Sequence, residues 1–450
     1  MEGRSGRPWR PSSMGRRAAA AGLGMLLAAL AASCGPKAPS APRPLLVIGL
    51  DAADWIPADS LLAAGRLPHL QRLLAQGARA ELLSFVPLEK SPVLWASIAT
   101  GLRPAQHGIG GFVREDADGG DQTPVRASSW RSPAFWDVAN AAGLRSDVVG
   151  WWVTHPARSI DGVMVSDYVP WAGGRDVPVR GLVAPDSLQP RVQSLRVAPQ
   201  EVGEEELGRF VDLAALRAAR PAPRLDERLQ TLSRIWAADR SYIAIGRWLA
   251  RRGDAELFVI YLRGLDMICH EFWRYWRTDT SPTRLSAEEI AVFGRVVPEY
   301  YAWADEALGE ILGWFPPDRQ VVVLSDHGFH GARLRKRGWT LGTEEHRREG
   351  IFVARGPLFR PGATGLRVDL LDVAPTLLAL VGLPPSAEMP GRIAAEGMTR
   401  AGRRLAARLE KDRVPTYASL APAAVADTAG VDPALDEDIR RQLRSLGYLQ

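Results

Sequence analysis

Aspartate side chains follow three of the most apolar runs in the chain. Asp51 follows LLVIGL, Asp266 comes shortly after LFVIYL, and Asp326 follows VVVLS. Such runs predict strands buried on both faces, and ligands of open α/β sheets bind beyond the carboxyl ends of these strands. Three carboxylates can share one small site at neutral pH only where a strong positive charge holds them. The pattern therefore predicts a metal site at this edge of a sheet.

Three imidazoles extend this set of possible metal ligands. His327 is adjacent to Asp326, His270 follows Asp266 by four residues, and His346 lies in a polar segment before the next apolar run. A single histidine is more often a structural or surface residue. Acid–imidazole pairs at several strand ends, however, are compatible with zinc, manganese or iron. Together these residues predict a two-metal hydrolytic centre.

Ser91 is the candidate nucleophile. Ser91-Pro92 opens a predicted helix that ends at Thr100-Gly101, because serine is favoured at the N-cap, proline at the first helical position and glycine after the last turn. A plain N-cap is the alternative interpretation of an isolated Ser-Pro pair. Beside a metal centre, a helix start attracts phosphate, and a serine oxygen on a metal would lose its proton near neutral pH, as metal-bound water does.

Several segments carry a family resemblance. IGLDAADW, SPVLWASIATGLRPAQHGI, LDMICH and LSDHGF, followed by His346, resemble the alkaline phosphatase superfamily and, within it, the type I phosphodiesterase/nucleotide pyrophosphatase branch. The resemblance extends from about Leu45 to Arg392. It implies an alkaline-phosphatase-like α/β fold, a metal-dependent phosphoric ester hydrolase and two divalent metal ions, taken to be Zn²⁺. One ion would be held by Asp51, Asp326, His327 and the Ser91 oxygen, and the other by Asp266, His270 and His346.

The chain departs from the family pattern near Ser91. Nucleotide pyrophosphatases usually have threonine at this position and an asparagine three residues later, where this chain has Leu94. The difference puts a nucleotide substrate in doubt. Sulfatases need a cysteine or serine followed by x-Pro-x-Arg, which SPVLW does not match.

The same segment bears on the type of phosphate ester. No arginine lies within Ser91–Thr100, whereas an enzyme specific for monoesters is expected to place one beside its nucleophile. We therefore expect hydrolysis of phosphodiesters through a phosphoseryl intermediate. Two alternatives stay open: a phosphoryl or phosphoethanolamine transferase acting on envelope components, and a non-catalytic surface binding protein on the same fold. The complete ligand set argues against the second, because a degenerate copy would be expected to lose ligands.

Aromatic and thiol side chains lie close to these segments in sequence. Trp95, Trp151 and Trp152 could form an aromatic wall that binds a substrate, with core packing as the alternative among 15 tryptophans. Cys269 lies between two expected ligands, but we expect it to be a packed free thiol.

The N-terminus has the pattern of a targeting segment. Basic residues up to Arg17 precede an apolar run over 18–32 that is shorter than the ~20 residues of a spanning helix but suits a signal peptide. The small residues before Cys34 resemble a bacterial lipoprotein cleavage site. We therefore expect a signal peptide over residues 1–33, a lipid on Cys34 and an extracytoplasmic location at a membrane of the bacterial cell envelope. An ordinary cleaved signal or an uncleaved anchor is the alternative.

The rest of the chain predicts one catalytic domain. Residues 34–44 form a Pro-rich tether, 45–399 the alkaline-phosphatase-like domain with a covering insertion at about 155–224, and 400–450 a helical tail. We expect a mostly parallel central sheet with helices on both faces. Long helices are predicted at 60–77, 225–252, 287–315 and 369–381.

The charge distribution argues against nucleic acid as the main partner. The formal net charge is +5, but the first 33 residues contain five arginines against one glutamate, so about +1 is left for the remainder. Without a basic stripe, a small-molecule or envelope phosphate ester is the expected partner.

Overall fold

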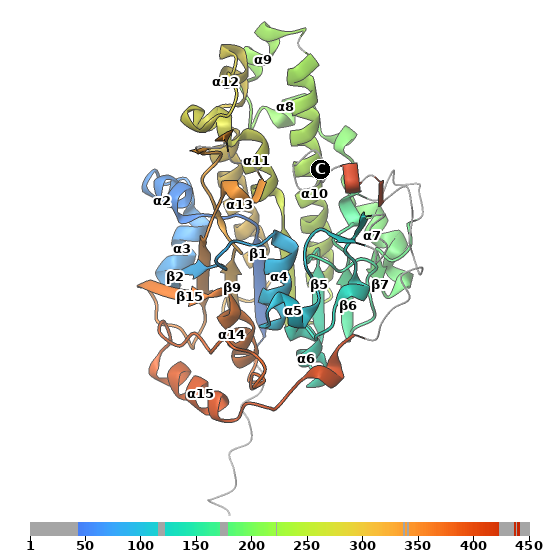
Figure 1. Ribbon diagram of the computed structural model, residues 1–450, viewed down its shortest axis with the longest axis vertical. Helices are drawn as coiled ribbons and strands as arrows, with labels where there is room; N and C mark the ends of the chain where they lie inside the picture. The colour runs from blue at the N-terminus through green and yellow to red at the C-terminus, as the bar shows by residue number, and fades with distance from the viewer. Residues whose placement is uncertain are drawn as a thin grey trace, which may run out of the picture. The chain divides into compact units, whose positions relative to one another are not determined.

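The central sheet has nine strands in the described part of the chain, in the order β15-β2-β14-β9-β1-β8-β5-β6-β7 (Figure 1). β1 (Leu45–Leu50) lies between β8 (Leu257–Leu262) and β9 (Gln320–Leu324), and both pairings are parallel. All three strands are buried along their whole length, as their apolar sequences predicted. The other strands are β2 (Gly77–Leu83), β5 (Ser146–Val149), β6 (Gly162–Val165), β7 (Val183–Ala184), β14 (Glu349–Arg355) and β15 (Ala363–Asp369).

Most strands of this sheet run in the same direction. β14 is antiparallel to both β9 and β2, and β7 is antiparallel to β6, while the other pairings are parallel. The expected mostly parallel α/β architecture is confirmed. The computed structural model describes residues 44–115, 122–171, 179–221, 223–335, 338–339, 342–422, 436–437 and 439–441.

Helices cover both faces of the sheet (Figure 1). One face carries α3 (Pro68–Gln76), α10 (Pro223–Ala250), α11 (Gly264–Trp276) and α13 (Val296–Gly313), which pack on one another. The opposite face carries α4 (Ser91–Thr100), α6 (Phe135–Ala141) and α14 (Val373–Leu380), and α14 also contacts α15 (Arg400–Lys411). Expected site residues lie on both faces, since Ser91 belongs to α4 whereas Asp266 and His270 belong to α11.

Two helices that were expected to be continuous are each broken in two. The region 60–77 contains the end of α2 (Trp55–Ala63) and then α3, because the chain turns at Gly65, with φ of 69°, and Pro68 starts a new helix. The region 287–315 contains α12 (Ala287–Phe293) and α13, separated at Gly294. α10, α14 and α15 lie where the sequence predicted helices.

The region 155–224, expected to be an insertion, contributes β6 and β7 to the edge of the sheet. It continues with α7 (Gln189–Leu195), α8 (Glu204–Leu207) and α9 (Leu213–Ala219), of which α7 contacts both β7 and α10. The signal peptide, Cys34 and most of the Pro-rich tether lie outside the described residues. Among the helices that the structure describes, none has the length and apolar character needed to span a membrane.

Candidate active site

Three predicted metal ligands meet at one edge of the sheet. Asp51 directly follows β1, Asp326 lies two residues beyond β9, and Asp266 is in the first turn of α11, just after β8. Because these neighbouring strands are parallel, their carboxyl ends lie side by side. All three carboxylates are buried, with at most 3% of their surface exposed.

One group of possible metal ligands surrounds His327. Single ligand atoms of Asp51, Asp266 and His327 all lie within 4.8 Å of one another. The Nε2 atom of His327 is 3.5 Å from Asp51 Oδ1, 3.5 Å from Asp326 Oδ2 and 3.3 Å from Ser91 Oγ. The structure therefore brings together the four residues expected to hold the first ion.

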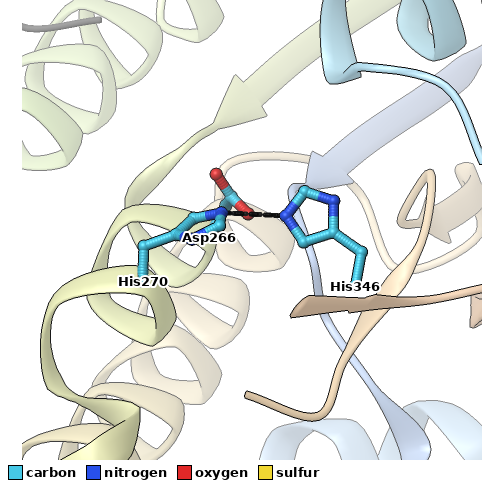
Figure 2. A group of neighbouring side chains, drawn as sticks. All are labelled: Asp266, His270 and His346. Carbon is cyan, nitrogen blue, oxygen red and sulfur yellow. Dashed lines mark hydrogen bonds and ion pairs between the residues drawn. The ribbon is translucent and has the colours of Figure 1, made fainter. Parts of the chain in front are cut away.

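A second group contains Asp266, His270 and His346 (Figure 2). Asp266 and His270 come from successive turns of α11, and His346 from the short strand β13 (His346–Arg347). Asp266 Oδ1 is 3.3 Å from His270 Nε2 and 3.4 Å from His346 Nε2, and the two imidazole nitrogens are 2.8 Å apart. Asp266 belongs to both groups, so the two sites are adjacent.

Hydrogen bonds at the far side of two imidazoles fix which nitrogen faces the site. The Nδ1 atom of His327 lies 3.1 Å from the carbonyl oxygen of Gly328, and Nδ1 of His270 lies 3.1 Å from Glu345 Oε2. In each case Nδ1 carries a proton, so Nε2 is the nitrogen that faces the carboxylates and would bind a metal. This is the arrangement of metal-binding histidines, whose second nitrogen commonly donates to a carbonyl or carboxylate.

Three buried carboxylates lie close together at this site, and one cationic imidazole faces Asp266: burial opposes the charge on His270, but Asp266 and Glu345 outweigh it and raise its pKa to about 10. Burial and the charge of Asp266 raise the pKa of Asp51, while burial and Asp51 raise the pKa of Asp326 well above its ordinary value. Burial also opposes ionisation of Asp266, but the facing His270 outweighs this effect and lowers the Asp266 pKa. Both oxygens of Asp326 lack a hydrogen-bond donor within the described residues. Donor type, orientation and excess negative charge all fit bound divalent cations.

Ser91 lies in the first turn of α4, and the preceding residue, Lys90, is the N-cap. The expected cap is thus shifted by one residue, while the predicted end at Gly101, with φ of 69°, is confirmed. The N–H groups of Val93 and Leu94 both donate to the Lys90 carbonyl, and Pro92 has no N–H. The helix start therefore offers a phosphoryl group fewer free N–H donors than the sequence predicted. Cations held by the two ligand groups would have to provide most of the stabilisation of the phosphoryl oxygens.

Asp54 is a positioning residue that the sequence interpretation missed. Its buried carboxylate accepts the Phe329 N–H at 3.0 Å, and Arg347 Nη1 donates to both of its oxygens, at 2.8 Å to Oδ1 and 3.0 Å to Oδ2. Phe329 and Arg347 each neighbour a ligand segment, in β10 (Gly328–Phe329) and β13, which pair with each other. Gly328 leaves space for this carboxylate, since a Cβ atom there would lie 2.3 Å from Asp54 Oδ2.

The three tryptophans expected near the site have different environments. Trp95 and Trp151 are completely buried, with ring centroids 4.9 Å apart, and Trp95 packs so closely on Gly49 of β1 that a Cβ atom there would lie 2.8 Å from the ring. The core-packing alternative thus describes both. Trp152 instead directs Nε1 toward Asp51 Oδ2, at 3.4 Å, and the hydroxyl of Tyr261 donates to the same oxygen.

Cys269 is a buried free thiol. It is absent from both ligand groups in the described residues, in agreement with the expected packing role.

Comparison with known families identifies the class of protein. The family model for type I phosphodiesterase / nucleotide pyrophosphatase matches residues 45–357, which include every predicted metal ligand and Ser91. The chain belongs to this metal-dependent family and is a phosphoric ester hydrolase of the phosphodiesterase/pyrophosphatase type. The resemblance seen in the sequence is confirmed. No curated protein sequence matches the chain.

Solved structures with similarity to the chain include two kinds of hydrolase. Phosphonoacetate hydrolase from Sinorhizobium meliloti 1021 is 18% identical, with 66% of this chain and 59% of that chain covered and a TM-score of 0.37. Murine ectonucleotide pyrophosphatase/phosphodiesterase 5, in complex with AMP, is 13% identical, with 79% and 100% covered and a TM-score of 0.43. The human form is 12% identical over the same shares, with a TM-score of 0.44.

Proposed function

We propose that this chain hydrolyses phosphodiesters through a phosphoseryl intermediate on Ser91 at a two-metal centre. The observation that carries the proposal is the convergence of two ligand groups that share Asp266, one of which meets Ser91 Oγ through His327. Zinc is our choice of metal because the donors are carboxylates and imidazoles. The first ion would be held by Asp51, Asp326, His327 and Ser91, and the second by Asp266, His270 and His346.

The residues of the site define what each step requires. When bound, the two cations would lower the pKa of the Ser91 hydroxyl and stabilise negative charge on the phosphoryl oxygens. Ser91 Oγ forms a bond to phosphorus as the bond to the leaving alcohol breaks, and the serine proton is released for transfer to that alcohol. Water then cleaves the phosphoserine, which yields a phosphate monoester and restores the hydroxyl. Gly328 and Glu345 hold the protons on Nδ1 of His327 and His270, so that both Nε2 atoms keep their orientation.

Metal analysis combined with a panel of nitrophenyl mono-, di- and sulfate esters tests the proposal. We expect about two ions per chain, as in two-metal hydrolases, faster cleavage of the phenyl diester than of the monoester, and no cleavage of the sulfate. Ser91→Ala should abolish turnover and retain most of the bound metal, whereas Ser60→Ala, at an exposed serine of α2, should keep the wild-type rate. Wild-type rates in Ser91→Ala would refute the nucleophile, and faster monoester cleavage would refute the diester preference.

The location of the enzyme is a separate part of the proposal. After removal of a signal peptide over residues 1–33, a lipid on Cys34 would tether the catalytic domain to an envelope membrane through the Pro-rich segment. An enzyme held there would act on small-molecule or envelope phosphate esters outside the cytoplasm.

A further inference from the structure

Arg263 lies beside the candidate metal centre, although the sequence interpretation did not include it among the site residues. It follows β8 directly and precedes α11, which carries two of the expected ligands. Its guanidinium carbon is 3.9 Å from the centroid of the Trp152 ring and 5.5 Å from that of Trp171. Trp152 Nε1 is in turn 3.4 Å from Asp51 Oδ2. One indole ring therefore separates the guanidinium from a predicted metal ligand.

Arg263 forms no direct ion pair with a carboxylate among the described residues, although burial raises the pKa of Asp167 and Asp239 and the charge of Arg263 offsets part of this effect. Within the described residues its guanidinium makes one hydrogen bond, of 3.5 Å, to the carbonyl oxygen of Asp167. The Asp167 carboxylate already receives the N–H groups of Val153 and Thr154. The nearby Asp239 carboxylate receives the Gly264 N–H and the Tyr300 hydroxyl. Both acids thus have other donors.

The half-buried side chain keeps its donors available for a ligand. A guanidinium that stacks on an aromatic ring is held in place by its face, while its five N–H groups point outward from its edge and match the oxygens of a carboxylate or phosphate. No Arg263 nitrogen is both buried and without a partner in the described chain, so the nitrogens that form no hydrogen bond there are open to solvent. The Trp152 and Trp171 rings therefore fix the charge near the metal centre without consuming the hydrogen bonds that an oxyanion would need.

We propose that Arg263 binds a second anionic group of the substrate, a carboxylate or a phosphate carried by the moiety next to the scissile phosphate. This inference rests on the proposed function and specifies its substrate class: phosphodiesters or pyrophosphates with a further oxyanion near the reacting phosphorus. Arg263 is then a specificity-determining residue, and Trp152 and Trp171 position it.

Three phosphonates of matched length test this role by calorimetry on the zinc-loaded protein. Ethylphosphonate presents one anionic group, whereas 3-phosphonopropionate and ethane-1,2-bisphosphonate add a carboxylate and a phosphonate, respectively. We expect the wild type to bind the ligands with a second anion roughly tenfold to a hundredfold more tightly, the range for hydrogen bonds to charged groups. The ligand that gains more identifies which oxyanion the site prefers. Metal content is measured in each sample, so that chelation by the bisphosphonate is recognised.

Substitutions of Arg263 then separate its role from general effects on the site. Arg263→Gln should reduce the preference for a second anion to less than about threefold, and Arg263→Lys should retain part of it, because lysine keeps the charge but loses the forked donors. Arg240→Gln is the matched control: Arg240 also lies over a tryptophan, 4.7 Å from the Trp236 ring centroid, but pairs with Glu206 at 3.2 Å. It should keep the wild-type preference.

The outcomes distinguish this inference from the proposed function. An unchanged preference in Arg263→Gln, or no preference in the wild type, would overturn the role of Arg263 and leave the phosphodiesterase proposal standing. Failure of the zinc-loaded wild type to cleave any nitrophenyl phosphate ester would overturn the proposed function, and this inference with it.

Discussion

Replacing Asp54 by alanine should loosen the metal centre without removing a predicted ligand. Asp54 is completely buried, caps α2 by accepting the Ile56 N–H at 2.7 Å, and holds Phe329 and Arg347 at the two ligand segments. In Asp54→Ala the Phe329 N–H loses its acceptor, and among the described residues the Arg347 guanidinium keeps its 3.1 Å contact to Glu349 alone. The paired strands β10 and β13 then lose the contacts that Asp54 provides to the loop that follows β1.

The contacts of Asp54 set the expected loss of stability in Asp54→Ala. Breaking a buried ion pair by removing one partner costs about 3–5 kcal/mol, and loss of a helix N-cap costs about 1 kcal/mol. The Arg347 side chain is 21% exposed, so water and Glu349 relieve part of its lost pairing and the lower end of the first range applies. We expect the free energy of unfolding to fall by roughly 4 kcal/mol. Metal affinity should fall about tenfold to a hundredfold, as for other residues that support metal ligands.

Urea unfolding followed by tryptophan fluorescence measures the first quantity, and competition with a chelator measures the second. Asp59→Ala is the matched control, because Asp59 also lies on α2 and pairs with an arginine, Arg79, at 2.7 Å, but its side chain is 48% exposed. Such an exposed pair contributes about 0–1 kcal/mol. If Asp54→Ala changed stability and metal affinity no more than Asp59→Ala does, the positioning role of Asp54 would be refuted.

Three further predictions concern the metals, the anchor and pH. Asp326→Ala should lower the metal content from about two ions toward about one per chain, because a ligand and a charge are lost together; unchanged metal content would refute this assignment. Cys34→Ser should abolish labelling by fatty acid and release much of the protein from membranes; retention with unchanged labelling would reject lipidation. His107 accepts the Ile109 N–H at 3.2 Å and contacts Ser97 Oγ at 2.9 Å, and burial lowers its pKa from 6.5 to about 4. Below pH 6.5 the unfolded chain binds a proton on His107, whereas the folded chain does so only near pH 4. The stability present above pH 6.5 is therefore lost as the pH falls to about 4, by up to about 3 kcal/mol. Urea unfolding of wild type and His107→Gln across this range should show that their difference in stability shrinks at acid pH, and a constant difference would contradict the prediction.

The sequence by itself determined the central strands and most of the residue types at the site. Leu45–Leu50, Leu257–Leu262 and Gln320–Leu324 are apolar on both faces, and such segments are stable only between two layers of helices. Because parallel strands end at one edge of a sheet, Asp51 and Asp326 were both expected at that edge. These conclusions depend on local composition and on a topology rule, both of which can be read along the chain.

Local signals also led to errors where backbone geometry decided the outcome. The helical pattern over 60–77 continues through Gly65, but the left-handed conformation of this residue ends one helix before Pro68 begins the next. An apolar period indicates which side chains face the core. It does not show where the backbone turns, because a break costs little when a glycine is available.

Only the tertiary structure decided how the site is connected. That Asp266 belongs to both ligand groups, that Asp54 holds Phe329 and Arg347, and that Arg263 lies over Trp152 are contacts between segments tens to hundreds of residues apart. Side-chain direction sets each of them, and it results from packing against residues that are remote in the chain. The absence of an arginine near Ser91 in sequence therefore did not exclude an arginine near the metal centre in space. A sequence pattern can specify a side chain and its strand end, whereas its partners depend on which surfaces the folded core brings into contact.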